Sequence, residues 1–276
     1  GLRGNITRTN LAYANEHRDW RVYEALAQVL IRKARRLYRE GSNGLDIDEM
    51  VYAVDASTID LCLSMFPWAH FRRTKAAIKL HTQIDLTGSI PVFMHITDGS
   101  VHDVHFMDRM LFEPGSIYVF DRGYLDFARL FRIESANAYF VIRAKSNMRF
   151  SLCKSRPVDK SCGLRCDQTI RLRTYKSKRD YPKKLRRISF FDTETRKRLV
   201  FLTNHFDLPA QAIAAIYKRR WQIELFFKWI KQNLRIKAFF GTTENAVRTQ
   251  IWIAICVYLM VACLNKVHGI DESLSR

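Results

Sequence analysis

The sequence has few of the residues on which disulfide-bonded, collagen-like or low-complexity proteins depend. Its 276 residues contain only 11 glycines, 6 prolines and 6 cysteines, with no internal repeat and no low-complexity tract. The cysteines are scattered, and Cys162 and Cys166, with Cys153 nearby, have the wrong spacing for a zinc ribbon and no obvious fourth ligand. We therefore expect reduced cysteines in a cytosolic protein.

Acidic residues are also scarce. The 27 Asp and Glu residues are outnumbered by 46 Lys and Arg residues, which gives a net charge of +19. This imbalance predicts a polyanionic partner, either nucleic acid or an anionic membrane surface. A membrane-spanning helix needs about 20 apolar residues, and the longest apolar run, at 251–264, is shorter. We expect this run to form a buried core helix, which leaves nucleic acid as the partner and no membrane.

A hydrophobic content of 47% and an aromatic content of 12% are typical of a globular chain. The chain begins GLRGN, without an initiator methionine or a signal peptide. We therefore expect a piece of a longer protein.

Hydrophobic periodicity predicts a chain of mixed α/β type. Residues 19–40 have helical periodicity, and residues 75–96 read as a hairpin around a turn at 86–89. The other expected elements are a short strand at 51–55, a helix at 102–112, a strand at 116–121, a helix at 124–133 and a strand at 138–145. This order indicates a mixed α/β sheet.

A basic β-rich segment interrupts this pattern. Between residues 143 and 199 there are 19 Lys and Arg but only 5 Asp and Glu, a net charge of +14. Strands are expected at 167–174, 186–192 and 198–204. We expect the cluster of Lys183, Lys184, Arg186 and Arg187 to contact phosphates, although a merely solvated face would have the same composition.

The segment 217–234 has the spacing of an amphipathic helix. At about 100° per residue, two groups of side chains fall on adjacent arcs of roughly 60° each. The polar arc holds Tyr217, Arg220, Glu224 and Lys231, and the apolar arc holds Ile216, Ile223, Phe227, Ile230 and Leu234. Ordinary i,i+4 ion pairs, Arg220 with Glu224 and Glu224 with Lys228, would also explain the polar arc.

Two predicted strands end in aspartate, at Asp55 and Asp121. Each aspartate alone would be an unremarkable turn residue. On neighbouring strands of one sheet, however, the carboxylates would lie side by side and would have to share a proton or bind a cation. Carboxylate oxygens suit Mg²⁺, and Glu224 would add a third. Two metal ions held in this way activate a water or a 3′-hydroxyl in phosphoryl transfer.

These segments together resemble the catalytic part of bacterial insertion-sequence transposases of the DDE class, in the insertion-sequence-4 group. The resemblance runs from Arg18 to Leu264. The segments that carry it are VDASTIDL, KLHTQIDLTGSIPVFMHITDGSVHD, VFDRGYLDF, YFVIRAKSN, the Tyr-x2-Arg-x3-Glu-x6-Lys helix and FFGTTENAVRTQIWIAI.

The resemblance implies a ribonuclease-H-like mixed α/β sheet with flanking helices, interrupted by a β-rich basic insertion. Asp55, Asp121 and Glu224 would be the catalytic residues and would bind two Mg²⁺ ions, with Mn²⁺ as a substitute. The expected DNA-binding residues around the cleaved end are Tyr217, Arg220, Lys231, Arg143 and Lys145. The expected parts of the chain are a helical remnant of the end-recognition region at 1–50, the first part of the core at 51–142, the insertion at 143–204 and the C-terminal core helices at 205–276.

The function implied is metal-dependent cleavage and strand transfer at insertion-sequence ends. The implied partners are double-stranded DNA with terminal inverted repeats and target DNA, bound by a homodimer in the bacterial cytoplasm at the nucleoid. Some relatives place a tryptophan of the insertion at a DNA hairpin end, and this insertion has none. A non-catalytic DNA-binding remnant of a transposase and a ribonuclease-H-like nuclease without strand transfer remain as alternatives.

Overall fold

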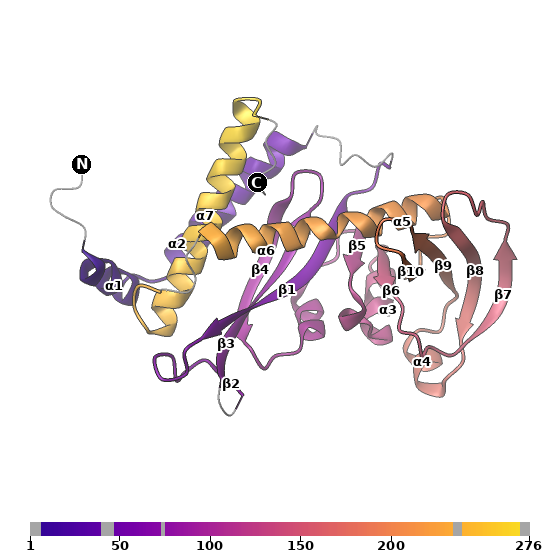
Figure 1. Ribbon diagram of the computed structural model, residues 1–276, viewed down its shortest axis with the longest axis horizontal. Helices are drawn as coiled ribbons and strands as arrows, with labels where there is room; N and C mark the ends of the chain where they lie inside the picture. Colours follow the sequence, from indigo (N-terminus) through magenta and orange to yellow (C-terminus); the bar gives the residue numbers. More distant parts are fainter. Residues whose placement is uncertain (1–6, 40–46, 73–74, 234–238, 271–276) are drawn as a thin grey trace.

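The computed structural model describes residues 7–39, 47–72, 75–233 and 239–270. The molecule is elongated (Figure 1), with helices α1 (Arg8–His17), α2 (Arg21–Tyr38) and α7 (Glu244–Val267) gathered at one end. The strands of the basic segment lie at the other end.

The described residues form one ten-stranded mixed sheet with the order β2-β3-β1-β5-β6-β10-β9-β8-β7, in which β4 also pairs with β3. The strands are β1 (Val51–Leu61), β2 (His70–Arg72), β3 (Lys75–Asp85), β4 (Ile90–Asp98), β5 (Ile117–Phe120), β6 (Tyr139–Arg143), β7 (Phe150–Arg156), β8 (Leu164–Leu172), β9 (Leu185–Asp192) and β10 (Lys197–Thr203). β1, β3 and β4 are antiparallel neighbours, whereas β5 and β6 run parallel to β1. The predicted mixed α/β sheet with flanking helices is therefore confirmed.

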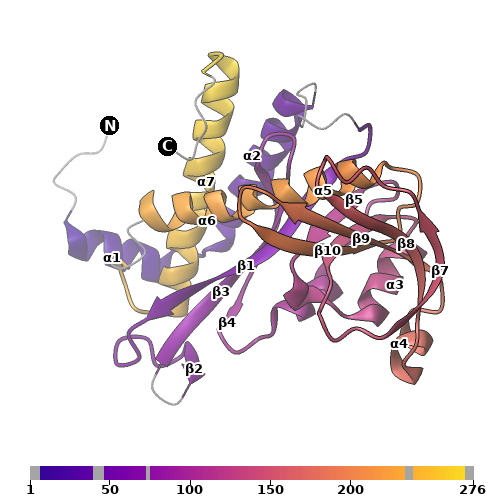
Figure 2. The ribbon, with the colours of Figure 1, turned by 45° about the vertical axis from the view of Figure 1, so that its right-hand side comes forward.

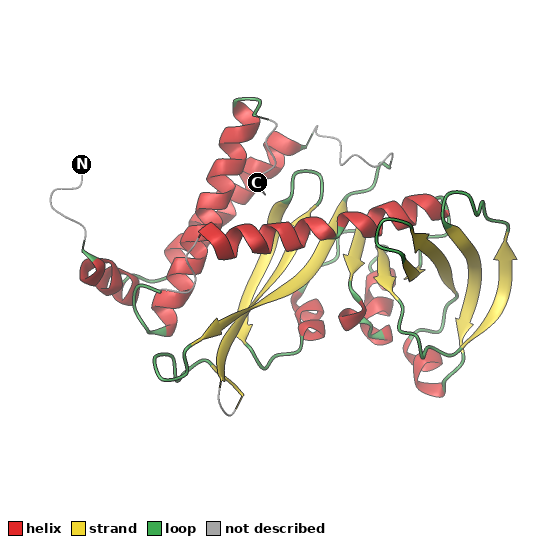
Figure 3. Cartoon of the chain, in the orientation of Figure 1, coloured by secondary structure: helices red, strands yellow, loops and turns green. Residues whose placement is uncertain are grey.

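Helices cover both faces of the central strands, as period-2 alternation along β1 requires. Val51 and Ala53 join the core under α2, α5 (Ala210–Arg219), α6 (Trp221–Asn233) and α7. Tyr52 and Val54 join a second core on the opposite face. That face is covered by η1 (Asp103–Arg109), η2 (Arg122–Tyr124) and α3 (Phe127–Ser135). Figure 3 shows α5 and α6 lying across the sheet almost end to end.

The expected strand at 51–55 is wrong in its length. β1 continues to Leu61 and pairs with β3 along that whole stretch, from Tyr52 opposite Asp85 to Leu61 opposite Ala76. Its pairing with β5 stops earlier, at Val54 opposite Phe120. Asp55 therefore lies in the middle of a strand, at the point where β5 ends and β1 continues.

The insertion strands extend the central sheet, as Figure 2 shows with this end turned forward. β10 pairs antiparallel with β6, with Phe201 opposite Arg143, and β9, β8 and β7 follow in order. The short helix α4 (Tyr175–Asp180) lies between β8 and β9. The sequence did not predict α1, β2, β7 or α4.

α7 contains the longest apolar run and is the core helix that the sequence predicted. By length and composition it would be able to cross a membrane, but 67% of its most apolar stretch is buried inside the structure. It packs against α2 and α1.

The helix predicted at 217–234 is interrupted at Arg220, which separates α5 from α6. Arg220 keeps a right-handed helical backbone (φ −52°, ψ −27°), so the helical path continues through the junction. The end of the predicted helix, at Leu234, lies outside the described residues.

Candidate active site

Asp55 lies in β1 and Asp121 directly follows β5, each one residue beyond a position at which these two adjacent strands are paired. Val54 of β1 is paired with Phe120 of β5, so Asp55 and Asp121 follow at the same level of the sheet. Alternation puts Asp55 on the same face as Ala53, which is the face covered by α5 and α6. The pKa of Asp55 is raised to about 6, mainly by burial; Arg220 and the Ala56 amide lower it, and the negative charges of Asp121 and Glu224 add to the rise.

Glu224 reaches the same place from the first turn of α6, and Arg220 joins it to the sheet. The Arg220 guanidinium donates from Nη1 to Asp55 Oδ2 at 2.8 Å and from Nη2 to Glu224 Oε1 at 2.6 Å. The exposed fractions of the three side chains are 15% for Arg220, 21% for Asp55 and 34% for Glu224. One guanidinium thus bridges a strand carboxylate and a helix carboxylate in a partly buried setting.

Asp121 is fixed by the turn that follows it. It caps η2, and its Oδ1 accepts a hydrogen bond from the Gly123 amide at 2.7 Å. A Cβ atom on Gly123 would lie 2.9 Å from that same oxygen, so any other residue at this position would displace the Asp121 carboxylate. The Asp-Arg-Gly-Tyr sequence therefore orients the Asp121 carboxylate locally.

A cavity of about 430 Å³ opens beside Asp55 and Glu224. Its lining residues are Asp55, Ala56, Ser57, Glu224, Phe227, Lys228, Lys231 and Gln232. Lys228 and Lys231 are exposed on α6, so the cavity lining combines carboxylates with ammonium groups. Such a mixed lining suits a phosphate bound next to metal-ligating carboxylates.

The donor set fits a hard divalent cation in its chemistry, since the side chains offer carboxylate oxygens, the ligands preferred by Mg²⁺. Within the described residues, no group of three or more His, Cys, Asp or Glu side chains already has an arrangement that would hold a metal ion. Arg220 is hydrogen-bonded to one oxygen of Asp55 and to one oxygen of Glu224.

Tyr217, at the end of α5, lies close to Arg220 and to β10. Its ring centroid is 5.8 Å from the Arg220 guanidinium carbon and 4.7 Å from the Phe201 ring centroid. Burial raises the pKa of Tyr217, while the positive charges of Arg220 and Arg143 lower it. Arg143, at the end of β6, is therefore within electrostatic range of this group, and Lys145 is exposed two residues beyond.

The expected phosphate contact of Arg186 is wrong, because this side chain is buried. Its guanidinium makes two hydrogen bonds to Asp167, at 2.9 and 2.8 Å, and also donates to the carbonyl oxygens of His205, Phe206 and Leu208.

The other three members of the predicted cluster differ in their surroundings. Lys184 is exposed, and Lys183 is exposed but pairs with Glu134 at 2.9 Å. Arg187 is half-buried, with its guanidinium carbon 5.1 Å from the Phe150 ring centroid.

Sequence reasoning missed several residues at these surfaces. Ser57, Lys228 and Gln232 line the cavity beside Asp55. Lys228 was expected only as an ion-pair partner of Glu224, although Glu224, Lys228 and Gln232 follow one another at four-residue spacing on one face of a helix. Arg149 and Arg173 line a second cavity of about 530 Å³ in the insertion, together with Met148, Phe150 and Thr174. These two arginines are 24 positions apart and come together only through the pairing of β7 with β8.

Carboxylates on a central mixed sheet, with cations on the adjacent helix, are the kind of site that metal-assisted phosphoryl-transfer enzymes use. The sequence matches the family described as the transposase DDE domain over residues 46–260. It is 34% identical to a putative transposase, y4zB, of Sinorhizobium fredii (strain NBRC 101917 / NGR234), over 96% of this chain and 74% of that protein. It is 30% identical to a probable transposase for insertion sequence element IS5377 of Geobacillus stearothermophilus, over 88% of this chain and 64% of that protein.

Among solved structures, a cryo-EM structure of a piggyBac transposase synaptic complex with hairpin DNA is similar, with a TM-score of 0.46 and 10% sequence identity. The similarity covers 82% of this chain and 49% of that one.

The chain belongs to the DDE transposase family. The predicted function, a DNA transposase of the insertion-sequence type, is thereby confirmed, and a non-catalytic remnant or a simple nuclease is not favoured. The chain spans less than two thirds of the Geobacillus relative.

Proposed function

We propose that the chain catalyses metal-dependent cleavage and strand transfer at insertion-sequence ends, with Asp55, Asp121 and Glu224 as the metal-binding residues. One observation carries this proposal. Arg220 is hydrogen-bonded both to Glu224 of α6 and to Asp55 of β1, and Asp121 lies at the level of Asp55 directly after β5. Like-charged carboxylates of this kind are stabilised by a shared proton or by a cation, and a divalent metal ion would provide the cation.

The fold that we propose is ribonuclease-H-like. The strand order β4-β3-β1-β5-β6, with three antiparallel strands followed by two parallel ones and helices on both faces, supports it. We also propose the organisation of a helical N-terminal segment at 1–50, a core at 51–142 and 205–276, and a basic insertion at 143–204.

The chemistry is divided between the cation and the chain. Two Mg²⁺ ions, or Mn²⁺ as a substitute, would activate a water or a 3′-hydroxyl and stabilise the leaving oxygen. Asp55, Asp121 and Glu224 would hold the ions, and the partial burial of Asp55 raises its pKa to about 6. Lys228 and Lys231 bind the phosphates on either side of the scissile one, since they line the same cavity as Asp55 and Glu224.

The partner is double-stranded DNA carrying terminal inverted repeats, with target DNA in the strand-transfer step. Tyr217, Arg220, Lys231, Arg143 and Lys145 face the cleaved end, and exposed cations of the insertion hold the flanking duplex. We further propose a homodimer on DNA, acting at the bacterial nucleoid.

The experiment that tests this proposal compares Asp55→Asn, Asp121→Asn and Glu224→Gln with Asp60→Asn. Asp60 is an exposed carboxylate on the same strand as Asp55 and serves as the matched control. Each of the first three variants should lose Mg²⁺-dependent nicking and joining of a labelled terminal repeat while still binding it, whereas Asp60→Asn should retain both activities. Nicking by Asp55→Asn at the wild-type rate would overturn the assignment, and nicking without joining by the wild type would favour a nuclease.

A further inference from the structure

Arg220 is placed between the two carboxylates that the proposed function assigns to metal ions. Its Nη1 and Nη2 atoms use Asp55 Oδ2 and Glu224 Oε1, at 2.8 and 2.6 Å. Its third nitrogen, Nε, is buried and has no hydrogen-bond partner. The guanidinium therefore donates hydrogen bonds to the carboxylates only from its Nη1 and Nη2 edge.

This placement makes the guanidinium and a divalent cation competitors for the same oxygens. A guanidinium stays protonated in proteins, so Arg220 cannot give way by losing its charge and has to move. If the Arg220 side chain moved away without finding a new partner, it would lose two charge-assisted hydrogen bonds and leave a partly buried positive charge unpaired. Such a movement is unfavourable.

A phosphate of bound DNA would supply that new partner. Arg220 lies at the junction of α5 and α6, four residues before Glu224, which lines the cavity together with Lys228 and Lys231. A phosphate held by these lysines offers paired oxygens that match the guanidinium fork. The exchange of carboxylates for phosphate would leave Asp55 and Glu224 free for metal ions.

We infer that Arg220 is a positioning residue that holds Asp55 and Glu224 in the metal-free chain and releases them when a DNA phosphate takes its guanidinium. Metal binding and DNA binding are then linked, each strengthening the other by the same factor. This inference rests on the proposed function, because that function supplies the metal ions and the DNA phosphate.

The test measures Mn²⁺ binding to the full chain by electron paramagnetic resonance, with and without a duplex oligonucleotide. For the wild type, the duplex should strengthen Mn²⁺ binding by about tenfold or more. For Arg220→Gln, Mn²⁺ should bind about tenfold more tightly than to the wild type without DNA, and the duplex should change little. Arg220→Lys, which has a point charge instead of a fork, should fall between them, and the neighbouring Arg219→Gln should behave as the wild type.

A second readout covers the case in which the loss of Arg220 weakens the fold. In EDTA, Arg220→Gln should melt below the wild type because Asp55 and Glu224 face each other without a cation, and Mn²⁺ should raise its melting temperature more than that of the wild type. An arginine with only a structural role would lower both melting temperatures equally and leave the Mn²⁺ effect unchanged.

The failures of the two proposals can be distinguished with Asp55→Asn. If Asp55→Asn binds Mn²⁺ as the wild type does, the assigned metal site and the proposed function are wrong. If Asp55→Asn loses Mn²⁺ but Arg220→Gln binds it no more tightly than the wild type does, the metal site stands and the role inferred for Arg220 is overturned.

Discussion

His81 of β3 is a buried imidazole whose neutral form the fold favours. Its Nε2 is 2.9 Å from Thr97 Oγ1, its Nδ1 has no partner, and its ring stacks on Phe106 with centroids 5.2 Å apart. Burial lowers the pKa of His81 to about 4. The smaller influences are Asp103, which raises this pKa, and Lys79, His95 and Arg109, which lower it.

The stability that neutral His81 contributes is complete above its unfolded pKa of about 6.5 and is lost as the pH falls toward 4. The loss in the free energy of unfolding should reach up to about 3 kcal/mol. Urea unfolding at pH 7 and pH 4.5 should show a smaller difference for His81→Gln than for the wild type. His102→Gln, at an exposed histidine, should keep the wild-type difference, and equal behaviour of the two variants would contradict the prediction.

Two buried tyrosines give an opposed pair of predictions. The Tyr124 hydroxyl is buried without a hydrogen-bond partner, whereas the Tyr52 hydroxyl donates to Glu113 at 2.6 Å and accepts from Arg35 at 2.7 Å. Tyr124→Phe should raise the free energy of unfolding by about 1 kcal/mol, and Tyr52→Phe should lower it by about 1–3 kcal/mol. Denaturant titration of both variants measures these free energies of unfolding. If Tyr124→Phe lowered the free energy of unfolding as much as Tyr52→Phe does, the Tyr124 hydroxyl would have to be hydrogen-bonded.

Much of the candidate site could be predicted at the scale of residues. Asp55, Asp121 and Glu224 were predicted from strand ends and helix spacing, although the strand end at Asp55 was misplaced. A carboxylate in an apolar run ends the hydrophobic pattern, but backbone pairing of β1 with β3 continues past it to Leu61. Spacing predicted the i,i+4 pair of Arg220 with Glu224, which the structure contains. The bond from Arg220 to Asp55 joins residues 165 positions apart along the chain and is not readable from local spacing.

At the scale of elements, β7 and α4, which the sequence missed, lack a buried stripe. β7 is exposed or half-exposed along its whole length, and α4 has no buried residue. Hydrophobic periodicity carries no signal for such elements. By contrast, the hairpin of β3 and β4 and the core helix α7 were found, because their apolar residues are continuous or periodic.

The buried pair of Arg186 and Asp167 ties β9 and β8 to the chain entering α5. Both side chains are almost fully buried, at 4% and 6% exposed. Removal of one partner leaves an uncompensated buried charge, so Arg186→Ala should lower the free energy of unfolding by about 3–5 kcal/mol. Lys184→Ala, at an exposed lysine, should change it by less than about 0.5 kcal/mol.

Urea titration of the two variants checks this prediction. Similar stabilities of Arg186→Ala and Lys184→Ala would mean that the Arg186–Asp167 pair contributes nothing net. Arg186 belonged to the expected phosphate-binding cluster, and its burial depends on an aspartate 19 residues away and on carbonyl groups after β10. Sequence alone does not reveal such a partner.

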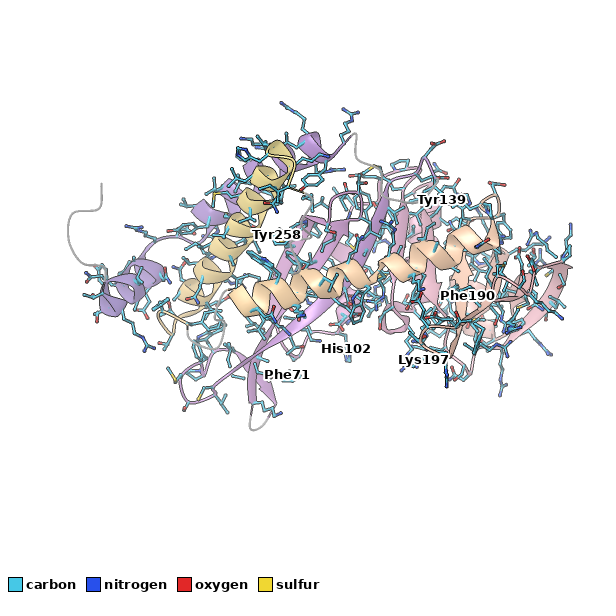
Figure 4. All side chains as sticks on the ribbon, turned by 45° about the horizontal axis from the view of Figure 1, so that its top comes forward. Phe71, His102, Tyr139, Phe190, Lys197 and Tyr258 are labelled. Carbon is cyan, nitrogen blue, oxygen red and sulfur yellow. The ribbon has the colours of Figure 1, made fainter. Side chains whose placement is uncertain are left out.

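At the scale of the whole molecule, positive charge is concentrated at the end opposite α2 and α7. Fifteen of the 19 Lys and Arg side chains between residues 143 and 199 are exposed. In Figure 4, Phe190 and Lys197 mark this end, and Tyr258 marks the helical end. This separation predicts that the insertion, and not the helical end, supplies most of the counterion release on DNA binding.

The double variant Arg149→Glu with Arg173→Glu tests whether the insertion contacts the DNA backbone. It reverses the charge of the two arginines that line the cavity in the insertion. Each phosphate contact contributes about 0.9 to the slope of log affinity against log salt. Loss of two contacts should therefore reduce the magnitude of the slope by about two and weaken binding to all duplexes alike, because phosphate contacts carry no sequence information. Affinity for two unrelated duplexes, measured across a salt series, gives both quantities.

The control is the double variant Arg32→Glu with Lys33→Glu, at two exposed cations of α2. It changes the net charge by the same amount at the opposite end of the molecule (Figure 1). If the insertion contacts the backbone directly, the control should keep the wild-type slope, since charges more than a Debye length of about 10 Å from the DNA are screened at 0.1 M salt. Equal slopes for the two double variants would mean that net charge, and not the position of the insertion, governs binding.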